Sequence, residues 1–171
     1  LEGDLDLVFV GINPGTYSAS VGHYYARPAN LFWPALSGSG LIPPLFKPED
    51  DWKLIRLRVG LTDVVGRATD GSGDLSAAEL KSGGIVVRNK ILFYRPRIVC
   101  FNGLTAYRAL FGTLEGPGPQ REKIGESHLF VVPSTSRRNA AYSREEVLRW
   151  FRLLKEFVDL NCNRYQPKSP R

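Results

Sequence analysis

Four short runs of apolar residues divide the chain into segments. They lie at 7–10, 61–65, 98–101 and 129–132, and glycine, proline or a polar loop follows each of them. Apart from Thr62 and Asp63 in the second run, the runs are unbroken, which is typical of strands that are covered on both faces. The pattern therefore predicts four buried strands.

Between these runs, apolar residues recur with helical spacing. Helices are predicted over 49–59 and 105–111, and two more begin after Ser76 and Ser143. Ser76 and Ser143 are each followed three residues later by glutamate, which is the signature of a capping box at a helix N-terminus. The last helix places five apolar residues on one face: Val147, Trp150, Phe151, Leu154 and Val158.

Strands that alternate with helices favour an α/β fold. We expect a three-layer α/β/α sandwich with a short, mostly parallel sheet of about four strands. Ligand sites of such sheets form at the carboxyl ends of the strands, which directs attention to the loops 11–30 and 133–142. The segment 112–125, rich in glycine and proline, is predicted to be a flexible surface excursion. We expect one domain over 1–160 and a basic, flexible tail over 161–171.

Composition and charge narrow the range of partners. The 171 residues include 23 Lys and Arg against 17 Asp and Glu, a net charge of +6 that favours a polyanion such as DNA or RNA. No apolar run is long enough to predict a membrane span. The two cysteines, Cys100 and Cys162, form no metal-spaced cluster, so we expect neither a metal nor a cofactor. Because the chain has no methionine, we expect it to be a domain of a longer protein, or one with disordered flanks.

The loop after the first predicted strand begins with Gly11-Ile12-Asn13-Pro14-Gly15. Glycine and proline allow a tight turn that presents the Asn13 side chain at the edge of the sheet. The glycine spacing does not fit a dinucleotide-binding loop, and the Gly-Lys-Ser/Thr of a P-loop is missing. A simpler reading is that Asn13 caps its own turn.

Residues farther along this loop favour a pocket for a flat ring. Tyr24-Tyr25 and Asn30 combine aromatic faces with an amide, the combination that an extruded nucleic-acid base needs for stacking and for edge hydrogen bonds. Phe32 and Trp33 are expected to be helix residues of the core. Tyr25 and Asn30 precede that helix and are the better candidates for the pocket.

Taken in order, these motifs resemble those of the mismatch-specific uracil/thymine-DNA glycosylase family. The resemblance rests on Gly11–Gly15, Gly22-His23-Tyr24-Tyr25, Pro28, Asn30-Leu31-Phe32-Trp33, Gly60-Leu61-Thr62-Asp63, Asp74-Leu75-Ser76, Tyr94-Arg95-Pro96-Arg97-Ile98, Phe101-Asn102-Gly103 and Pro133-Ser134-Thr135-Ser136-Arg137-Arg138. The later part is closer to the eukaryotic thymine-DNA glycosylases than to the bacterial uracil enzymes.

The resemblance implies roles for individual residues. Asn13 would position the water that attacks the sugar, and Tyr25 would stack on the flipped base. Ile12 and the backbone around Gly15 would bond the base edge, with Asn30 near the 5-position. Ser18 stands where the animal thymine enzymes have alanine, and its hydroxyl predicts poor acceptance of thymine.

Asp63 departs from the family pattern, since animal relatives carry asparagine there and bacterial ones lysine. An ionised carboxylate accepts hydrogen bonds only, so it suits the N3–H of uracil or the amino group of cytosine. Asp63 is therefore a candidate for extending the substrate range towards cytosine derivatives. The alternative is that its side chain points away and only satisfies a loop.

The second loop carries Ser134, Thr135 and Ser136, whose small side chains let backbone amides approach phosphates. The resemblance implies that Arg138 enters the duplex as a wedge and that Arg137 contacts the DNA backbone. His23 is expected to contact a phosphate or to organise its own loop.

The sequence thus predicts a monofunctional DNA glycosylase, which flips a uracil, thymine or modified pyrimidine from a mainly G-mispaired duplex and hydrolyses its N-glycosidic bond. The expected partner is double-stranded DNA with a lesion or mismatch, and the expected state is a monomer, nuclear if eukaryotic and otherwise cytoplasmic. Two alternatives remain open: a non-catalytic DNA damage-binding domain, and a nucleotide-binding protein unrelated to DNA.

Overall fold

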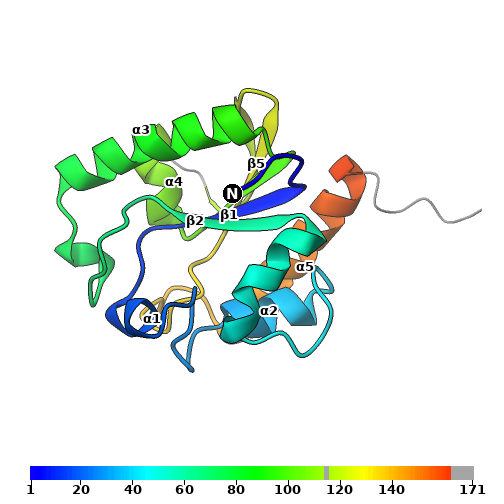
Figure 1. Cartoon of the computed structure of the whole chain (residues 1–171), viewed down its shortest axis with the longest axis horizontal. Helices are drawn as coiled ribbons and strands as arrows, with labels where there is room; N and C mark the ends of the chain where they lie inside the picture. Colours follow the sequence, from blue (N-terminus) through cyan, green and yellow to red (C-terminus); the bar gives the residue numbers. More distant parts are fainter. Residues whose placement is uncertain (114–115, 163–171) are drawn as a thin grey trace, which may run out of the picture.

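One five-stranded sheet runs through the middle of the computed structural model, which describes residues 1–113 and 116–162 (Figure 1). The strand order is β2-β1-β3-β5-β4, and every neighbouring pair is parallel except β4 with β5. The strands are β1 (Leu7–Gly11), β2 (Val59–Asp63), β3 (Ile98–Asn102), β4 (Gly118–Ile124) and β5 (Ser127–Val132). The chain therefore adopts the predicted α/β fold with a mostly parallel sheet.

Helices cover both faces of this sheet and form a three-layer sandwich. In Figure 1, α3 and α4 lie on one side of the sheet, and α2 and α5 lie on the other. The helices are α1 (Thr16–Val21), α2 (Phe32–Gly38), α3 (Ala77–Tyr94), α4 (Leu104–Phe111) and α5 (Arg144–Cys162), with 3-10 helices η1 (Pro48–Leu57) and η2 (Ser72–Asp74). None of the described helices combines the length and apolarity needed to cross a membrane.

Each central strand contributes side chains to two separate hydrophobic cores, because successive side chains point to opposite faces of a sheet. On β1, Leu7 and Phe9 pack with α2 and α5, whereas Val8 and Val10 pack with α3 and α4. β3 and β5 alternate in the same way. Cys100 is fully buried in the first of these cores. Burial on both faces explains why these strands are continuously apolar.

The predicted helix starts are confirmed by hydrogen bonds. Ser76 Oγ accepts from the Glu79 amide at 3.2 Å, and the Ser76 amide donates to the Glu79 carboxylate at 2.9 Å. The Ser143–Glu146 box repeats this exchange at 3.2 and 2.7 Å. The helix predicted over 49–59 is the 3-10 helix η1, and the second strand covers Val59–Asp63 instead of 61–65.

Two predictions are wrong. Residues 118–124 are not a flexible excursion but the edge strand β4, so the sheet has five strands and not four. Its one-sided exposure leaves charged residues along it, and these hide the strand from a search for apolar runs. The predicted tail begins too early, since Asn161 and Cys162 belong to α5; residues 163–171 lie outside the described part of the chain.

Close approach of α3 to α4 depends on Gly84. A Cβ at this position would lie 2.6 Å from the carbonyl oxygen of Ala109, a backbone atom that cannot easily move. We expect Gly84→Ala to destabilise the fold by about 1–3 kcal/mol, the usual cost of overpacking. Gly38→Ala is the matched control, because Gly38 is also helical and has no neighbouring atom within 4 Å of the added carbon. Urea unfolding of both variants measures the difference, and equal midpoints would contradict it.

Candidate active site

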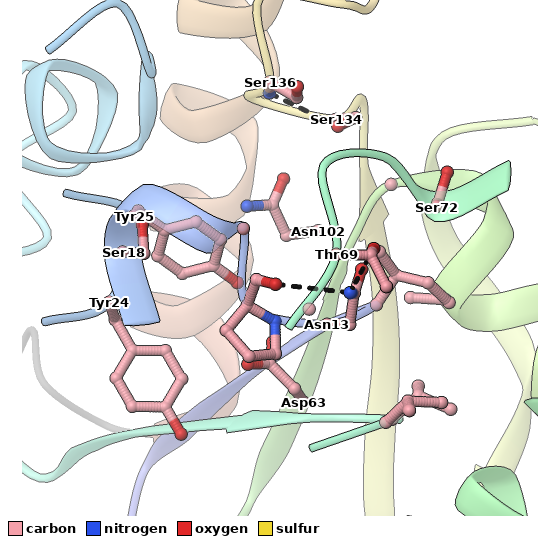
Figure 2. Close-up of a pocket in the computed structure, with 18 of the residues that line it drawn as sticks. Asn13, Ser18, Tyr24, Tyr25, Asp63, Thr69, Ser72, Asn102, Ser134 and Ser136 are labelled. Atoms are coloured by element: carbon pink, nitrogen blue, oxygen red, sulfur yellow. Dashed lines mark hydrogen bonds between the residues drawn. The ribbon is translucent and has the colours of Figure 1, made fainter. Parts of the chain in front are cut away.

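A pocket of about 980 Å³ opens at the carboxyl ends of the parallel strands. Gly11 pairs in register with Asp63, and Asn102 pairs with Val132, so the loops that follow β1, β2, β3 and β5 start side by side. All four loops contribute to the pocket wall. Figure 2 shows residues from these loops gathered around it. The structure thus brings the two predicted loops, 11–30 and 133–142, to one site.

The carboxamide of Asn13 is held on its nitrogen side (Figure 2). Nδ2 donates to the carbonyl of Arg67 at 2.9 Å and to Thr69 Oγ1 at 2.7 Å, with a longer contact of 3.2 Å to the carbonyl of Pro14. Thr69 Oγ1 gives its own proton to the carbonyl of Gly71 at 2.8 Å, so towards Asn13 it can only accept. Because these partners are all acceptors, the end of the amide that faces them must be its NH2 group.

The oxygen of this carboxamide is left for the pocket. No hydrogen bond joins Asn13 Oδ1 to any residue of the described ranges, and Asn13 is only half-buried. A carbonyl oxygen fixed in this way accepts a hydrogen bond from water or substrate. The two shortest bonds of Asn13 reach residues more than 50 positions away, so its role is not confined to capping its own turn.

Tyr25 lies deep in the same pocket. Its ring stacks on Phe32, with centroids 4.0 Å apart and an interplanar angle of 25°. Its backbone has a φ of 53°, which costs energy in a non-glycine residue and is held by the surrounding turn. Ser18 supports that turn, since its hydroxyl accepts from the Ala26 amide at 3.0 Å. His23 also organises the loop, because its Nδ1 lies 3.3 Å from Asp51 Oδ2 on η1.

The Asp63 carboxyl group and the Tyr25 hydroxyl meet over Gly11, the last residue of β1. A Cβ on Gly11 would lie 2.7 Å from the Tyr25 oxygen and would collide with Asp63 Oδ1, so glycine is required here for space. The Tyr25 oxygen is buried and has no well-formed hydrogen bond within the described residues. Burial and the charge of Asp63 raise the Tyr25 pKa well above its ordinary value, and the nearby Asn102 amide opposes them.

Burial likewise raises the pKa of Asp63 to about 7, although the positive charge of Lys90 acts in the opposite direction. The carboxyl group is therefore partly protonated at neutral pH. Asp63 lines the pocket, and its Oδ1 atom lies beside Gly11 at the end of β1. A protonated carboxyl group donates a hydrogen bond and an ionised one only accepts, so Asp63 can present either character.

The remaining residues predicted for the base pocket also line it, but some of their polar groups already form hydrogen bonds within the protein. Asn30 Oδ1 accepts from the Phe32 amide at 2.9 Å and so supports the start of α2. The carbonyl of Ile12 accepts from the Val65 amide at 2.9 Å. Gly15 precedes α1 and pairs with Thr69. Phe32 and Trp33 are buried core residues of α2, as predicted.

The second loop is braced from beneath by Asn102. Thr135 donates its amide to Asn102 Oδ1 at 3.1 Å and accepts from Asn102 Nδ2 at 2.9 Å through its hydroxyl. The Ser134 hydroxyl accepts from the Ser136 amide at 3.3 Å (Figure 2). Thr135 is buried, whereas Ser136, Arg137 and Arg138 are exposed at the rim of the pocket. Arg138 reaches across to the loop after β2, where its guanidinium lies against Gly71.

Sequence reasoning found no role for Thr69 or Asn102, although both hold other site residues in place. Each forms a hydrogen bond with a residue at least 33 positions away, and no local periodicity predicts such a contact. Thr69 and Asn102 stand out because they are polar and buried, but their burial is visible only in the folded structure. Among residues 1–113 and 116–162, no three His, Cys, Asp or Glu side chains gather closely enough to hold a metal ion.

A comparison with known protein families identifies the superfamily of this chain. The family described as "UDG: Uracil DNA glycosylase superfamily" matches residues 2–157, which include all five strands and the whole pocket. Members of this superfamily are DNA N-glycosylases, hydrolases that act on DNA in base excision repair. The chain belongs to the uracil-DNA glycosylase superfamily.

Proposed function

We propose that this chain is a monofunctional glycosylase for uracil and related pyrimidines, mainly those mispaired with guanine. The observation that carries the proposal is the Asn13 carboxamide at the pocket wall, whose nitrogen is bonded to the protein and whose oxygen has no hydrogen bond among the described residues. A domain that only binds damaged DNA has no use for an amide arranged in this way.

In the proposed reaction, Asn13 Oδ1 accepts a hydrogen bond from a water and aims it at C1′ of the flipped nucleotide. The water oxygen forms the new bond to C1′, and the electron pair of the N-glycosidic bond leaves with the base. An amide takes up no proton near neutral pH, so the proton of the water passes to the departing base through solvent. The acceleration comes from orientation and from fixed dipoles around the leaving group.

The aromatic wall of the pocket suits a flipped pyrimidine. Phe32 supports one face of the Tyr25 ring, and we assign the base to stacking against this aromatic pair. Ser18 lies beside the same turn, and its bulk supports uracil over thymine. Arg138 is the proposed wedge that fills the gap in the duplex, and this offsets part of the unstacking cost of a few kcal/mol.

Asp63 is the proposed discriminator between base edges. When ionised, it accepts from the amino group of a cytosine derivative; when protonated, it donates to the O4 atom of uracil. Because its pKa is about 7, the balance between the two forms changes within the physiological range.

Asn13→Ala is expected to retain the fold and DNA affinity but to lose excision by about a hundredfold or more, because an unpositioned water attacks far less often. Single-turnover cleavage of a uracil·guanine duplex, followed by alkali, measures the rate, and fluorescence anisotropy measures the affinity. Unchanged excision would remove Asn13 from the mechanism. Binding without any excision by the wild-type chain would favour the alternative function of a non-catalytic damage-binding domain.

Arg138→Ala is expected to lower base flipping and single-turnover excision by roughly tenfold or more, because the gap in the duplex is left unfilled. 2-Aminopurine next to the lesion reports flipping. Arg137→Ala is the matched control: as a phosphate contact it weakens binding to all sequences and reduces the salt dependence of affinity by about one counterion. Wild-type flipping by Arg138→Ala would refute the wedge.

Asp63→Asn tests the discriminator through a ratio of rates. In the wild-type chain, excision of a 5-substituted cytosine relative to uracil is expected to rise by up to about a hundredfold between pH 6 and 8, because the ratio of ionised to protonated Asp63 rises by that factor around a pKa of about 7. The variant is expected to give a flat ratio, since an amide both donates and accepts at every pH. The same pH slope in both proteins would contradict the assignment.

Stability gives an independent control for this pKa. The folded-state pKa of Asp63 lies above its ordinary value of 3.8, so its contribution to stability is complete below pH 3.8 and is lost as the pH rises through 7. Asp63→Asn removes that loss. The variant should therefore gain in Tm relative to the wild type at pH 8 compared with pH 5.

A further inference from the structure

The loop that binds the Asn13 carboxamide is itself fixed to the rest of the protein by an ion pair. Residues 66–74 form the middle of the connection between β2 and α3, and within them the Arg67 carbonyl and the Thr69 hydroxyl accept the two shortest hydrogen bonds of Asn13 Nδ2. The orientation of the carboxamide therefore depends on where this loop sits. Only two backbone hydrogen bonds tie Thr69 to the chain around Asn13: the Thr69 amide donates to Pro14, and the Thr69 carbonyl accepts from Thr16.

The Arg67 side chain ties the loop to the start of α3. Arg67 Nε donates to Glu79 Oε1 at 2.7 Å and Nη2 donates to Glu79 Oε2 at 3.1 Å, a two-pronged pair. Nη2 also donates to the carbonyl of Asp74 at 2.9 Å, at the far end of the loop. One guanidinium thus joins both ends of the loop to the first turn of α3.

Glu79 is itself held in place. Its carboxylate accepts from the amide and the hydroxyl of Ser76, both at 2.9 Å, as part of the α3 capping box. The bonds from Arg67 and Ser76 lower the pKa of Glu79 to about 2, so the carboxylate stays ionised over the working pH range. Both partners keep substantial solvent exposure, 52% for Arg67 and 32% for Glu79. An ion pair this exposed adds little to folding stability, so its contribution lies in geometry.

We infer that the Arg67–Glu79 ion pair is a positioning device for the Asn13 carboxamide. It acts through the backbone: the guanidinium fixes residue 67, the carbonyl of residue 67 fixes Asn13 Nδ2, and the amide oxygen is thereby aimed into the pocket. Arg67 and Glu79 are positioning residues and need not touch the substrate. This inference rests on the proposed role of Asn13.

Two conservative variants break the pair without removing its surroundings. Glu79→Gln keeps a residue that can complete the capping box but loses the charge and one of the two acceptor oxygens. Arg67→Lys keeps the charge but cannot form a two-pronged pair. The control is Asp159→Asn, which breaks the Lys155–Asp159 pair on α5, distant in sequence from the site and also partly exposed.

Three measurements on the full chain test the inference: the single-turnover excision rate on a uracil·guanine duplex, the Kd for that duplex, and the side-chain amide resonances of Asn13, assigned by their loss in Asn13→Ala. We expect both variants to excise on the order of ten- to a hundredfold more slowly, the range for a misplaced reacting group. Kd should change less than twofold, Tm should be unchanged, and the Asn13 amide resonances should shift and broaden. Asp159→Asn should leave all of these as in the wild type.

Other outcomes overturn the inference in distinguishable ways. Wild-type excision by both variants removes the pair from catalysis, and slower excision with unmoved Asn13 resonances means that it acts by another route. A weaker Kd at an unchanged rate makes Arg67 a DNA contact instead. If Asn13→Ala itself excises at the wild-type rate, the proposed role of Asn13 fails together with the inference, whereas a wild-type chain that binds DNA without any excision overturns the proposed function. An inactive Asn13→Ala beside fully active pair variants overturns the inference alone.

Discussion

The site depends on how two loops share hydrogen bonds around one carboxamide. Asn13 follows β1, Thr69 follows β2, and parallel pairing of these strands starts both loops at the same edge of the sheet. The acceptors on the β2 side bind the nitrogen of the amide and leave its oxygen for the pocket. An unsupported asparagine could rotate by half a turn and present a donor instead, with the opposite chemical character.

A second constraint lies at the end of β1, where Gly11 leaves room for two polar groups. Asp63 from β2 and Tyr25 from the loop after α1 approach its backbone so closely that no side chain fits. Both groups are drawn out of water, and desolvation disfavours the charged form of each. At neutral pH the pocket thus holds a neutral tyrosine hydroxyl and a carboxyl group that is only partly ionised.

The two halves of the pocket do different work. The side formed by the loops after β1 and β2 combines aromatic rings with hydrogen-bonded polar groups, and it holds the groups proposed to face the base and the sugar. The loop after β5 is braced at Thr135 by Asn102, yet it leaves two arginines exposed at the rim. A braced base beneath exposed cations suits an element that meets DNA, because phosphate contacts position a protein on the duplex.

The sequence by itself determined the fold class, four of the strands and two helix starts, because apolar runs and capping boxes are local patterns. It also pointed to Asn13, Tyr25, Asp63 and the loop of Arg138, although through their order along the chain and not through contacts. β4 escaped notice because an exposed edge strand carries charge where a buried one carries apolar residues. Only the tertiary structure decided how the Asn13 carboxamide is oriented, why residue 11 must be glycine and which residues hold the loops. The bonds that orient Asn13 and brace the second loop join residues 33 to 56 positions apart, and no periodicity along a chain encodes a contact of that kind.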